Sequence, residues 1–474
     1  MKPGSIRKIL PFIQFVLVLI FLSPVEIYPV ENYLLDIDQC VKLGLKLNKN
    51  LQYIDAEISL QLAAIDQQYR QFYPHFNFNL GDNASVIYSS QDSKNKNISV
   101  SVSQMIYDGN KLGNQIRNSE ISMMLAILEN EQKRIDYIYS VIEQYLALLT
   151  LYERIELKNM LYENQKNEYF ITKKRYELGE ATSLDLYEWE IEMQENQLSL
   201  MENTNDLNNK ILDFKKLIGL SKDDTIGLNE KLKYDMKIVA TNFYSKEVIN
   251  NAFQASIELK KLEFSMQQAQ LNSVAKQQIL PDIYLNASYS TPLDHLFREK
   301  DTWNLGFTIT LPFFFDKVSL QSSIGGDLNG LQKSFNQSAG STIYENPSYF
   351  QSLASENLSF DKLNYSYTET RNNIELETVK LLDEIKFQKE KIDILDKKII
   401  LSEDKNKILQ KQLSLGELRL SEYIKFQNTL HSSKLDRLET IHSYMSLLIK
   451  LYKLQGKMSE SSLQLLFKDF LIKK

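Results

Sequence analysis

The most restrictive feature of this sequence is an internal repeat, in which the same motifs occur twice in the same order. A polar helical stretch, a proline and an alternating apolar segment follow one another around Pro74 and again around Pro281. Two further matching pairs are residues 106–108 with 314–316 and residues 178–180 with 415–417. A chain that repeats itself in this way folds as two copies of one unit, so its 474 residues do not require three unrelated compact domains.

The composition excludes several classes of protein. A single Cys and four His, namely His75, His295, His431 and His442, cannot form a disulfide framework or a Cys-rich metal site and make a His-based centre improbable. The 55 basic and 61 acidic residues are interleaved, so no basic stripe for a nucleic acid exists. We therefore expect no metal, no cofactor and no nucleic-acid partner, and the structural interpretation of all four His is preferred.

The N-terminus has the charged, apolar, polar order of a secretory signal. Lys2, Arg7 and Lys8 precede an apolar run from Ile9 to Leu22, which is shorter than the roughly 20 residues that a membrane-spanning helix needs. We predict that residues 1–30 are a signal peptide, with an uncleaved anchor as the open alternative. No later segment is long and apolar enough for such a helix, so a membrane domain in the mature chain would have to be a β-barrel.

Long stretches without Gly or Pro predict rod-like helices. Residues 114–178 and 350–415 form long arms, each of roughly 100 Å at about 1.5 Å per residue. Shorter arms are predicted at 183–218 and 420–455, and helices before the strands at 36–72 and 246–280. Apolar residues at alternating spacings of three and four, such as Ile135, Ile138 and Ile142, are typical of a coiled coil, although a helical-bundle core uses the same period. A short arm and a pre-strand helix together match one long arm, so four rods per chain are expected.

Four segments alternate apolar and polar residues and are predicted strands. They lie at about 76–81, 98–103, 283–290 and 305–311, and their polar positions are mostly Ser, Asn, Thr and Gly. A small uncharged face suits the inside of a water-filled barrel, while a half-buried sheet of a soluble protein gives a similar pattern. Four strands cannot close a barrel alone, so oligomerisation is expected, and three copies would supply twelve strands. The fold class is thus mainly α with a β-barrel portion.

The repeat defines the predicted domain organisation. The first structural repeat spans 31–245 and the second 246–456, followed by a C-terminal tail at 457–474. The second repeat contains an insertion at about 317–345 that is rich in Gly, Ser, Asn and Gln and is predicted to be a loop.

Several motifs in this order resemble the TolC-like outer membrane efflux protein family, over about residues 34–456. They are residues 35–41 opening the first helix, the helix-to-strand junctions at Pro74 and Pro281, the strand endings at 104–109 and 311–316, the two Leu-Gly-Glu hairpins, and the closing segments 216–219 and 453–456. The sequence departs from the family at Met105, where Pro is usual, and after Asp316, where the insertion begins.

The resemblance implies a homotrimer with a twelve-stranded barrel in the outer membrane lipid of a diderm bacterium and a long helical tube in the periplasm. It implies an exit duct that works with a periplasmic adaptor, or membrane fusion protein, and an inner membrane pump. The duct would serve a tripartite efflux pump or a type I secretion system, and the exported substrate is not readable from the sequence. The alternative is a periplasmic coiled-coil scaffold or adhesin without channel activity. No catalytic motif is present, so we do not expect an enzyme.

The candidate functional residues lie at the hairpin tips. Gly179 and Gly416 reverse the chain after the long arms, and the resemblance implies that these tips dock the adaptor. It also implies that Asp185, Glu188 and Glu422 line a periplasmic entrance gate, where three-fold symmetry would form rings of carboxylates that bind cations. The alternative for Asp185 and Glu422 is stabilisation of a helix N-terminus. Lys425 interrupts the acidic pattern of the second tip.

Overall fold

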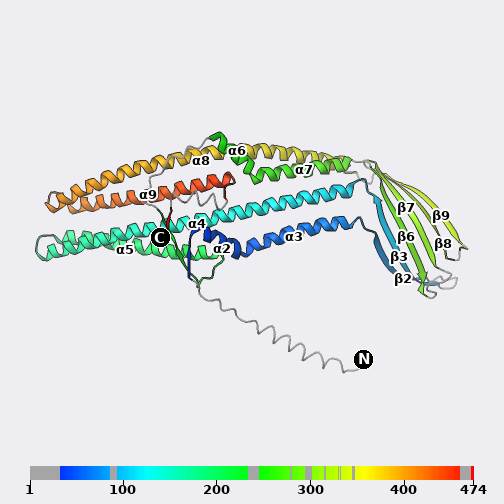
Figure 1. Ribbon diagram of the computed structural model, residues 1–474, viewed down its shortest axis with the longest axis horizontal. Coiled ribbons are helices and arrows are strands. Elements are labelled where there is room, and N and C mark those ends of the chain that lie inside the picture. The colour runs from blue at the N-terminus through cyan, green and yellow to red at the C-terminus, as the bar shows by residue number, and fades with distance from the viewer. Residues whose placement is uncertain are drawn as a thin grey trace, which may run out of the picture.

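The computed structural model of the chain is elongated, with helices along its long axis and a sheet at one end (Figure 1). It describes residues 32–85, 93–232, 245–277, 280–293, 301–313, 316–328, 330, 332–343, 347–458 and 471–473. The predicted signal peptide at 1–30, His295 and most of the tail at 457–474 lie outside these residues.

Two long helical hairpins make up most of the molecule. The first consists of α4 (Lys111–Glu177) and α5 (Ser183–Ile218), and the second of α8 (Tyr349–Ser414) and α9 (Leu420–Leu454). The predicted long and short arms are confirmed as helices, because stretches this long without Gly or Pro have no reason to break. Both hairpins turn at the end of the molecule opposite the sheet (Figure 1).

The helices that precede the strands are each broken, which corrects the prediction of continuous helices at 36–72 and 246–280. The first divides into α2 (Ile37–Leu47) and α3 (Lys49–Arg70) at Asn48, whose extended backbone lets its side chain accept from the Asn50 N–H at 2.9 Å. The second divides into α6 (Ser245–Ala255) and α7 (Ile257–Gln277) at Ser256, whose hydroxyl accepts from the Leu259 N–H at 3.2 Å. In both, a short polar side chain satisfies backbone donors that the break exposes.

The helices nearest the sheet form one layer in the order α3, α4, α7, α8. Along α4, α3 and α5 lie end to end, and along α8, α7 and α9 do the same (Figure 1). This arrangement matches the four rods per chain expected from the helix lengths.

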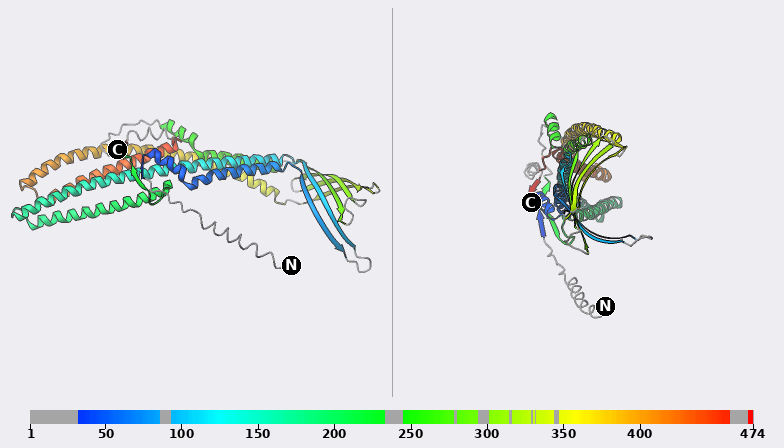
Figure 2. Two further views of the ribbon diagram at one scale, coloured as in Figure 1. Left: turned by 60° about the horizontal axis from the view of Figure 1, so that its bottom comes forward. Right: turned by 90° about the vertical axis from the view of Figure 1, so that its right-hand side faces the viewer.

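The sheet has six antiparallel strands in the order β2-β3-β6-β7-β8-β9. They are β2 (His75–Ser85), β3 (Ser93–Tyr107), β6 (Asp282–Pro292), β7 (Thr302–Phe313), β8 (Asp316–Asp327) and β9 (Lys333–Thr342). The sheet is curved when it is viewed from the strand end (Figure 2). The first four strands were predicted, but the prediction of a loop at 317–345 is wrong, because most of this insertion forms β8 and β9. The prediction of four strands per chain is corrected to six.

A compact core lies midway along the helices, where two short sheets join them. β1 (Asn32–Leu35) pairs in parallel with β4 (Thr225–Leu228), and β10 (Leu471–Lys473) pairs antiparallel with β5 (Glu230–Leu232). These strands cover fully buried side chains of α4, α5 and α9, among them Ile142, Tyr145, Phe214 and Ile449. The segments at 32–35 and 471–473 are thus held against the connector between the two repeats.

A polar cluster fixes this core. The Tyr145 hydroxyl donates to the Glu230 carboxylate at 2.7 Å, and the Ile37 N–H at the start of α2 donates to the same oxygen at 3.2 Å. Glu230 is buried, and burial together with this carboxylate raises the pKa of Tyr145 well above its usual range. Buried polar groups of this kind are costly when a partner is lost. The cluster therefore ties β5, α2 and α4 to one another.

Among the described residues, none of the helices is both long and apolar enough to cross a membrane.

We expect Tyr145→Phe to lower the free energy of unfolding by about 1–3 kcal/mol, because the buried Glu230 carboxylate loses a donor. Tyr176→Phe is the matched control, since Tyr176 is exposed near the end of α4, and it should change the free energy little. Urea unfolding in detergent, followed by circular dichroism, measures both. Equal effects of the two variants would contradict a stabilising role for the Tyr145 hydroxyl.

Candidate functional site at the hairpin tips

Both hairpin tips are closed by the same backbone turn. Gly179 and Gly416 have φ of +77°, the left-handed region that favours glycine. The Glu180 N–H donates to the Arg175 carbonyl at 2.7 Å, and the Glu417 N–H donates to the Gln412 carbonyl at 2.9 Å. These are the bonds with which a Schellman motif satisfies the last carbonyls of a helix. The space around both glycines is open, so the glycine is required by the backbone and not by a close neighbour.

The two descending helices begin differently. Thr182 caps α5, since its hydroxyl accepts from the Asp185 N–H at 3.2 Å and the Asp185 carboxylate accepts from the Thr182 N–H at 2.9 Å. This capping box is the local role that the sequence allowed for Asp185. The equivalent residue of α9 is Arg419, which makes no side-chain cap hydrogen bond. The first tip is therefore held more firmly than the second.

An apolar cluster joins the two hairpins just behind the tips. Trp189 of α5 is buried with Tyr423 and Ile424 of α9. Partly buried side chains from α4, α8 and the second tip surround them, namely Tyr169, Leu409, Leu413, Leu418 and Leu420. Burial raises the pKa of the Tyr423 hydroxyl. The cluster fixes the position of α5 relative to α9, although these helices belong to different repeats.

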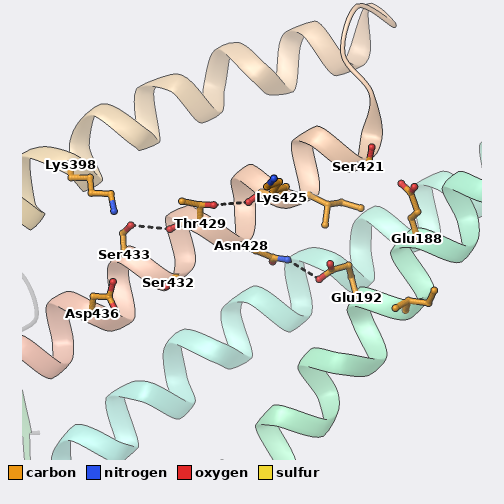
Figure 3. Close-up of a pocket in the computed structure, with 12 residues that line it drawn as sticks. Glu188, Glu192, Lys398, Ser421, Lys425, Asn428, Thr429, Ser432, Ser433 and Asp436 are labelled. Atoms are coloured by element: carbon orange, nitrogen blue, oxygen red, sulfur yellow. Dashed lines mark hydrogen bonds between the residues drawn. The ribbon is translucent and has the colours of Figure 1, made fainter.

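A groove of about 630 Å³ lies next to this cluster, between α5 and α9 (Figure 3). Its acidic side chains are Glu188 and Glu192 from α5 and Asp436 from α9, and its basic side chains are Lys398 from α8 and Lys425 from α9. The Asn428 amide donates to the Glu192 carboxylate at 3.0 Å across the groove (Figure 3). The groove is thus polar, of mixed charge, and built from both repeats.

The structure brings only one of the predicted gate residues into this groove. Glu188 lines it, whereas Asp185 lies one turn earlier in the capping box and Glu422 is exposed in the first turn of α9. Sequence reasoning missed Glu192, although its position one turn after Glu188 places both on one helix face. It did single out Lys425, which lines the opposite wall.

The helix-to-strand junctions lie at the other end of the helices. Pro74 and Pro281 stand directly before β2 and β6. Lys111, the first residue of α4, forms an ion pair of 2.6 Å with Asp282, the first residue of β6. The Gln104 amide of β3 donates to the Phe72 carbonyl at 2.8 Å, between α3 and β2. These contacts connect β6 to the start of α4 and β3 to the segment between α3 and β2, so they help to set the angle between the sheet and the helices.

The described histidines are not arranged to bind a metal, and the described residues contain no cluster of three or more metal-ligating side chains. His431 is mostly buried, and its burial, with Lys158 and Lys434 nearby, lowers its pKa to about 4. His442 lies 3.1 Å from the Thr150 hydroxyl through Nδ1, and burial lowers its pKa as well. His75 is exposed at the start of β2.

Comparisons with known proteins agree with this architecture. Residues 41–220 match the profile of a family described as outer membrane efflux protein. The structure is similar to the Campylobacter jejuni CmeC outer membrane channel, with a TM-score of 0.65, 14% identity and coverage of 91% of this chain and 89% of that chain. The sequence matches no curated protein significantly.

Two further solved structures have the same fold. The outer membrane protein VceC from Vibrio cholerae has a TM-score of 0.69 and 14% identity, and the match covers 89% of this chain and 96% of that chain. The open state of the Neisseria gonorrhoeae MtrE outer membrane channel has a TM-score of 0.67 and 12% identity, with 89% of each chain covered.

These findings show that residues 41–220 match the outer membrane efflux protein family and that the chain has the fold of known outer membrane channels. The family match is confined to residues 41–220, whereas the similarity of fold covers about nine tenths of the chain. An outer membrane location goes with that family.

We expect Thr182→Ala to destabilise the start of α5 by about 1 kcal/mol, because the N-cap hydroxyl and the capping box are lost. Arg419→Ala, at the equivalent position of α9, should have little effect since Arg419 makes no such bond. Hydrogen exchange of the amides at 178–186 and 415–423 measures the two tips separately. If the amides at 178–186 were protected from exchange as well in Thr182→Ala as in Arg419→Ala, the capping box would not hold the first tip.

Proposed function

We propose that this chain is the outer membrane exit duct of an export system. Three copies form a ring of strands in the outer membrane lipid and a helical tube in the periplasm, and substrates pass along the common axis. The hairpin tips with Gly179 and Gly416 dock a periplasmic adaptor, which connects the duct to an inner membrane pump. The duct serves a tripartite efflux pump or a type I secretion system.

The observation that carries the proposal is the two-sided character of the sheet. On one face lie large apolar side chains that are exposed to a degree unusual in a soluble sheet, among them Phe76, Phe78, Leu80, Leu305 and Phe335. On the other face lie mostly small uncharged side chains, with charged residues at the strand ends. The Ser103 hydroxyl donates to the Asn286 amide oxygen at 2.9 Å there, and the Asn286 amide donates to Thr308 at 3.4 Å. This arrangement fits a barrel whose apolar outer face contacts lipid and whose polar inner face contacts water.

A surface-labelling experiment tests the proposal. Single cysteines introduced within 89–97 and 291–302, ranges that include the ends of β3, β6 and β7 farthest from the helices, should react with a membrane-impermeant maleimide in intact cells. A cysteine at Glu180, at the periplasmic tip, should react only after the outer membrane is permeabilised. The mature chain should also require detergent and run as a heat-modifiable trimer. A monodisperse monomer without detergent, with both sites equally protected in cells, would instead favour a periplasmic scaffold.

We further propose that the carboxylates near the tips form a cation-binding entrance. Glu188 and Glu192 present two carboxylates on one face of α5, and Glu422 adds a third from α9. Three-fold symmetry repeats each of these groups around the axis, and rings of like charge in a narrow entrance bind cations. Asp185 contributes charge at the same level while it caps its own helix.

We expect the combined change Asp185→Asn, Glu188→Gln and Glu422→Gln to raise single-channel conductance and to weaken block by Mg²⁺, because the carboxylate rings are neutralised. Asn is preferred at position 185 because its amide oxygen can still accept the hydrogen bond from the Thr182 N–H in the capping box. Glu177→Gln is the matched control, since Glu177 is exposed at the end of α4 away from the groove. Unchanged conductance and block in planar bilayers would remove these carboxylates from the gate.

A further inference from the structure

The hairpin formed by β8 and β9 continues the membrane sheet instead of decorating it. β8 pairs with β7 over its whole length, from Asp316 opposite Phe313 to Asp327 opposite Thr302, and β9 pairs with β8 over ten residues. The edge that β7 would otherwise present is therefore occupied. Among the described residues, β2 pairs only with β3 and β9 only with β8, so β2 and β9 are the two edges of the sheet.

Both faces of the sheet extend across this hairpin in register. One row of directly paired residues is apolar on all six strands: Phe76, Val102, Ala287, Leu305, Ile324 and Phe335. An adjacent row is small and uncharged throughout: Asn77, Ser101, Ser288, Asn304, Gly325 and Ser334. A surface loop or an independent hairpin has no reason to keep this alternation. β9 is the most polar strand on the apolar face, where Gln337, Ser341 and, at the strand end away from the helices, Lys333 accompany Phe335 and Ala339.

We propose that β8 and β9 are part of the membrane wall, so that three copies close a ring of eighteen strands, in which β9 of one copy pairs with β2 of the next. This inference rests on the proposed function. The sheet has an even number of alternating strands, so β9 runs antiparallel to β2 of the neighbour, as closure requires. Unpaired edges in lipid are not tolerated, because each exposed N–H or C=O there costs several kcal/mol.

The strand tilt of this ring follows when His75 of one copy is placed opposite Thr342 of the next, since both residues lie at the helix end of the sheet. The row through His75, the first residue of β2, reaches Asn336 on β9, and the last residue of β9 is Thr342, six positions further on. At about 3.3 Å per residue and about 4.8 Å between strands, this displacement corresponds to a tilt of about 35°, at the lower end of the usual range for barrels.

At this tilt, the six strands and the four helices that meet them cover similar lengths of the circumference. At that tilt six strands cover about 35 Å of circumference. The four helices that meet the sheet, α3, α4, α7 and α8, cover about 32–40 Å at the usual separation of about 8–10 Å. A ring of eighteen strands is therefore continuous with a tube of twelve helices without a step in diameter. Barrels of this strand number enclose an aqueous channel.

The proposed closure also specifies which residues meet. Alignment of His75 with Thr342 of the neighbouring copy, both next to helices, pairs Phe78 with Ala339 and Asn79 with Ser338. Apolar residues then meet on the lipid face and polar residues on the lumen face. Any register shifted by one residue would reverse this match.

Cysteine cross-linking tests the inference. The double variant Phe78→Cys with Ala339→Cys, treated with a short bis-maleimide in the membrane, should shift most of the chain to covalent dimers and trimers on denaturing gels. The matched control is Phe78→Cys with Ile309→Cys, which would link copies only if β7, and not β9, met β2 of the neighbour. In the proposed ring this pair should not link. The wild-type chain controls for Cys40, which is buried and should not react.

The outcomes separate the inference from the proposed function. Links at positions 78 and 309, or a trimer that links at neither pair, would overturn the eighteen-stranded ring and leave the duct intact. A chain that remains monomeric in detergent would overturn both. Electron cryomicroscopy of the unmodified complex gives a second measurement: eighteen strands in the ring support the inference, and twelve contradict it.

Discussion

The structure depends on one constraint, which is that every backbone N–H and C=O group of a strand needs a partner. The helices satisfy theirs internally, and the short strands at the centre of the molecule satisfy theirs with residues far away in the sequence. The six-stranded sheet leaves two edges, at β2 and β9. In the membrane that we propose for a sheet with one apolar and one small polar face, these edges find partners only when copies of the chain close a ring. In our proposal, assembly, membrane insertion and the duct all follow from that requirement.

The two repeats share the same backbone structure at their hairpin tips but differ in the side chains there. Both tips use a glycine with positive φ and the same closing hydrogen bonds, yet Thr182 caps one descending helix and Arg419 stands at the other. The groove between α5 and α9 likewise has glutamates on one wall and Lys425 on the other. Duplication supplied the rods, and divergence of a few tip residues produced an asymmetric surface at the end that faces the adaptor in our proposal.

Much of the architecture was predictable because it depends on local periodicity. The long arms and short arms end within a residue or two of the positions set by Gly179, Gly416 and the neighbouring polar residues, since backbone strain at those sites is independent of the rest of the fold. The sequence analysis did not predict the helix breaks at Asn48 and Ser256, because a single polar residue within a helical pattern is also common in an unbroken helix. β8 was missed although Val318, Leu320 and Ile324 alternate with polar residues, because the surrounding Gly, Ser and Asn favoured a loop. At the tips, the sequence identified the acidic residues and gave a helix N-terminus as the alternative role of Asp185, and the structure shows Asp185 in the capping box of α5.

The sequence by itself determined the repeat, the rods, the two-sided strands and the glycine turns, because each of these is fixed by spacing along the chain. Only the tertiary structure decided that the inserted hairpin joins the sheet, that Trp189 meets Tyr423 between the hairpins, and that Glu230 is buried beneath Tyr145. Those contacts join residues far apart in sequence, and their free energy depends on which surfaces meet when the two repeats come together, which no local pattern specifies.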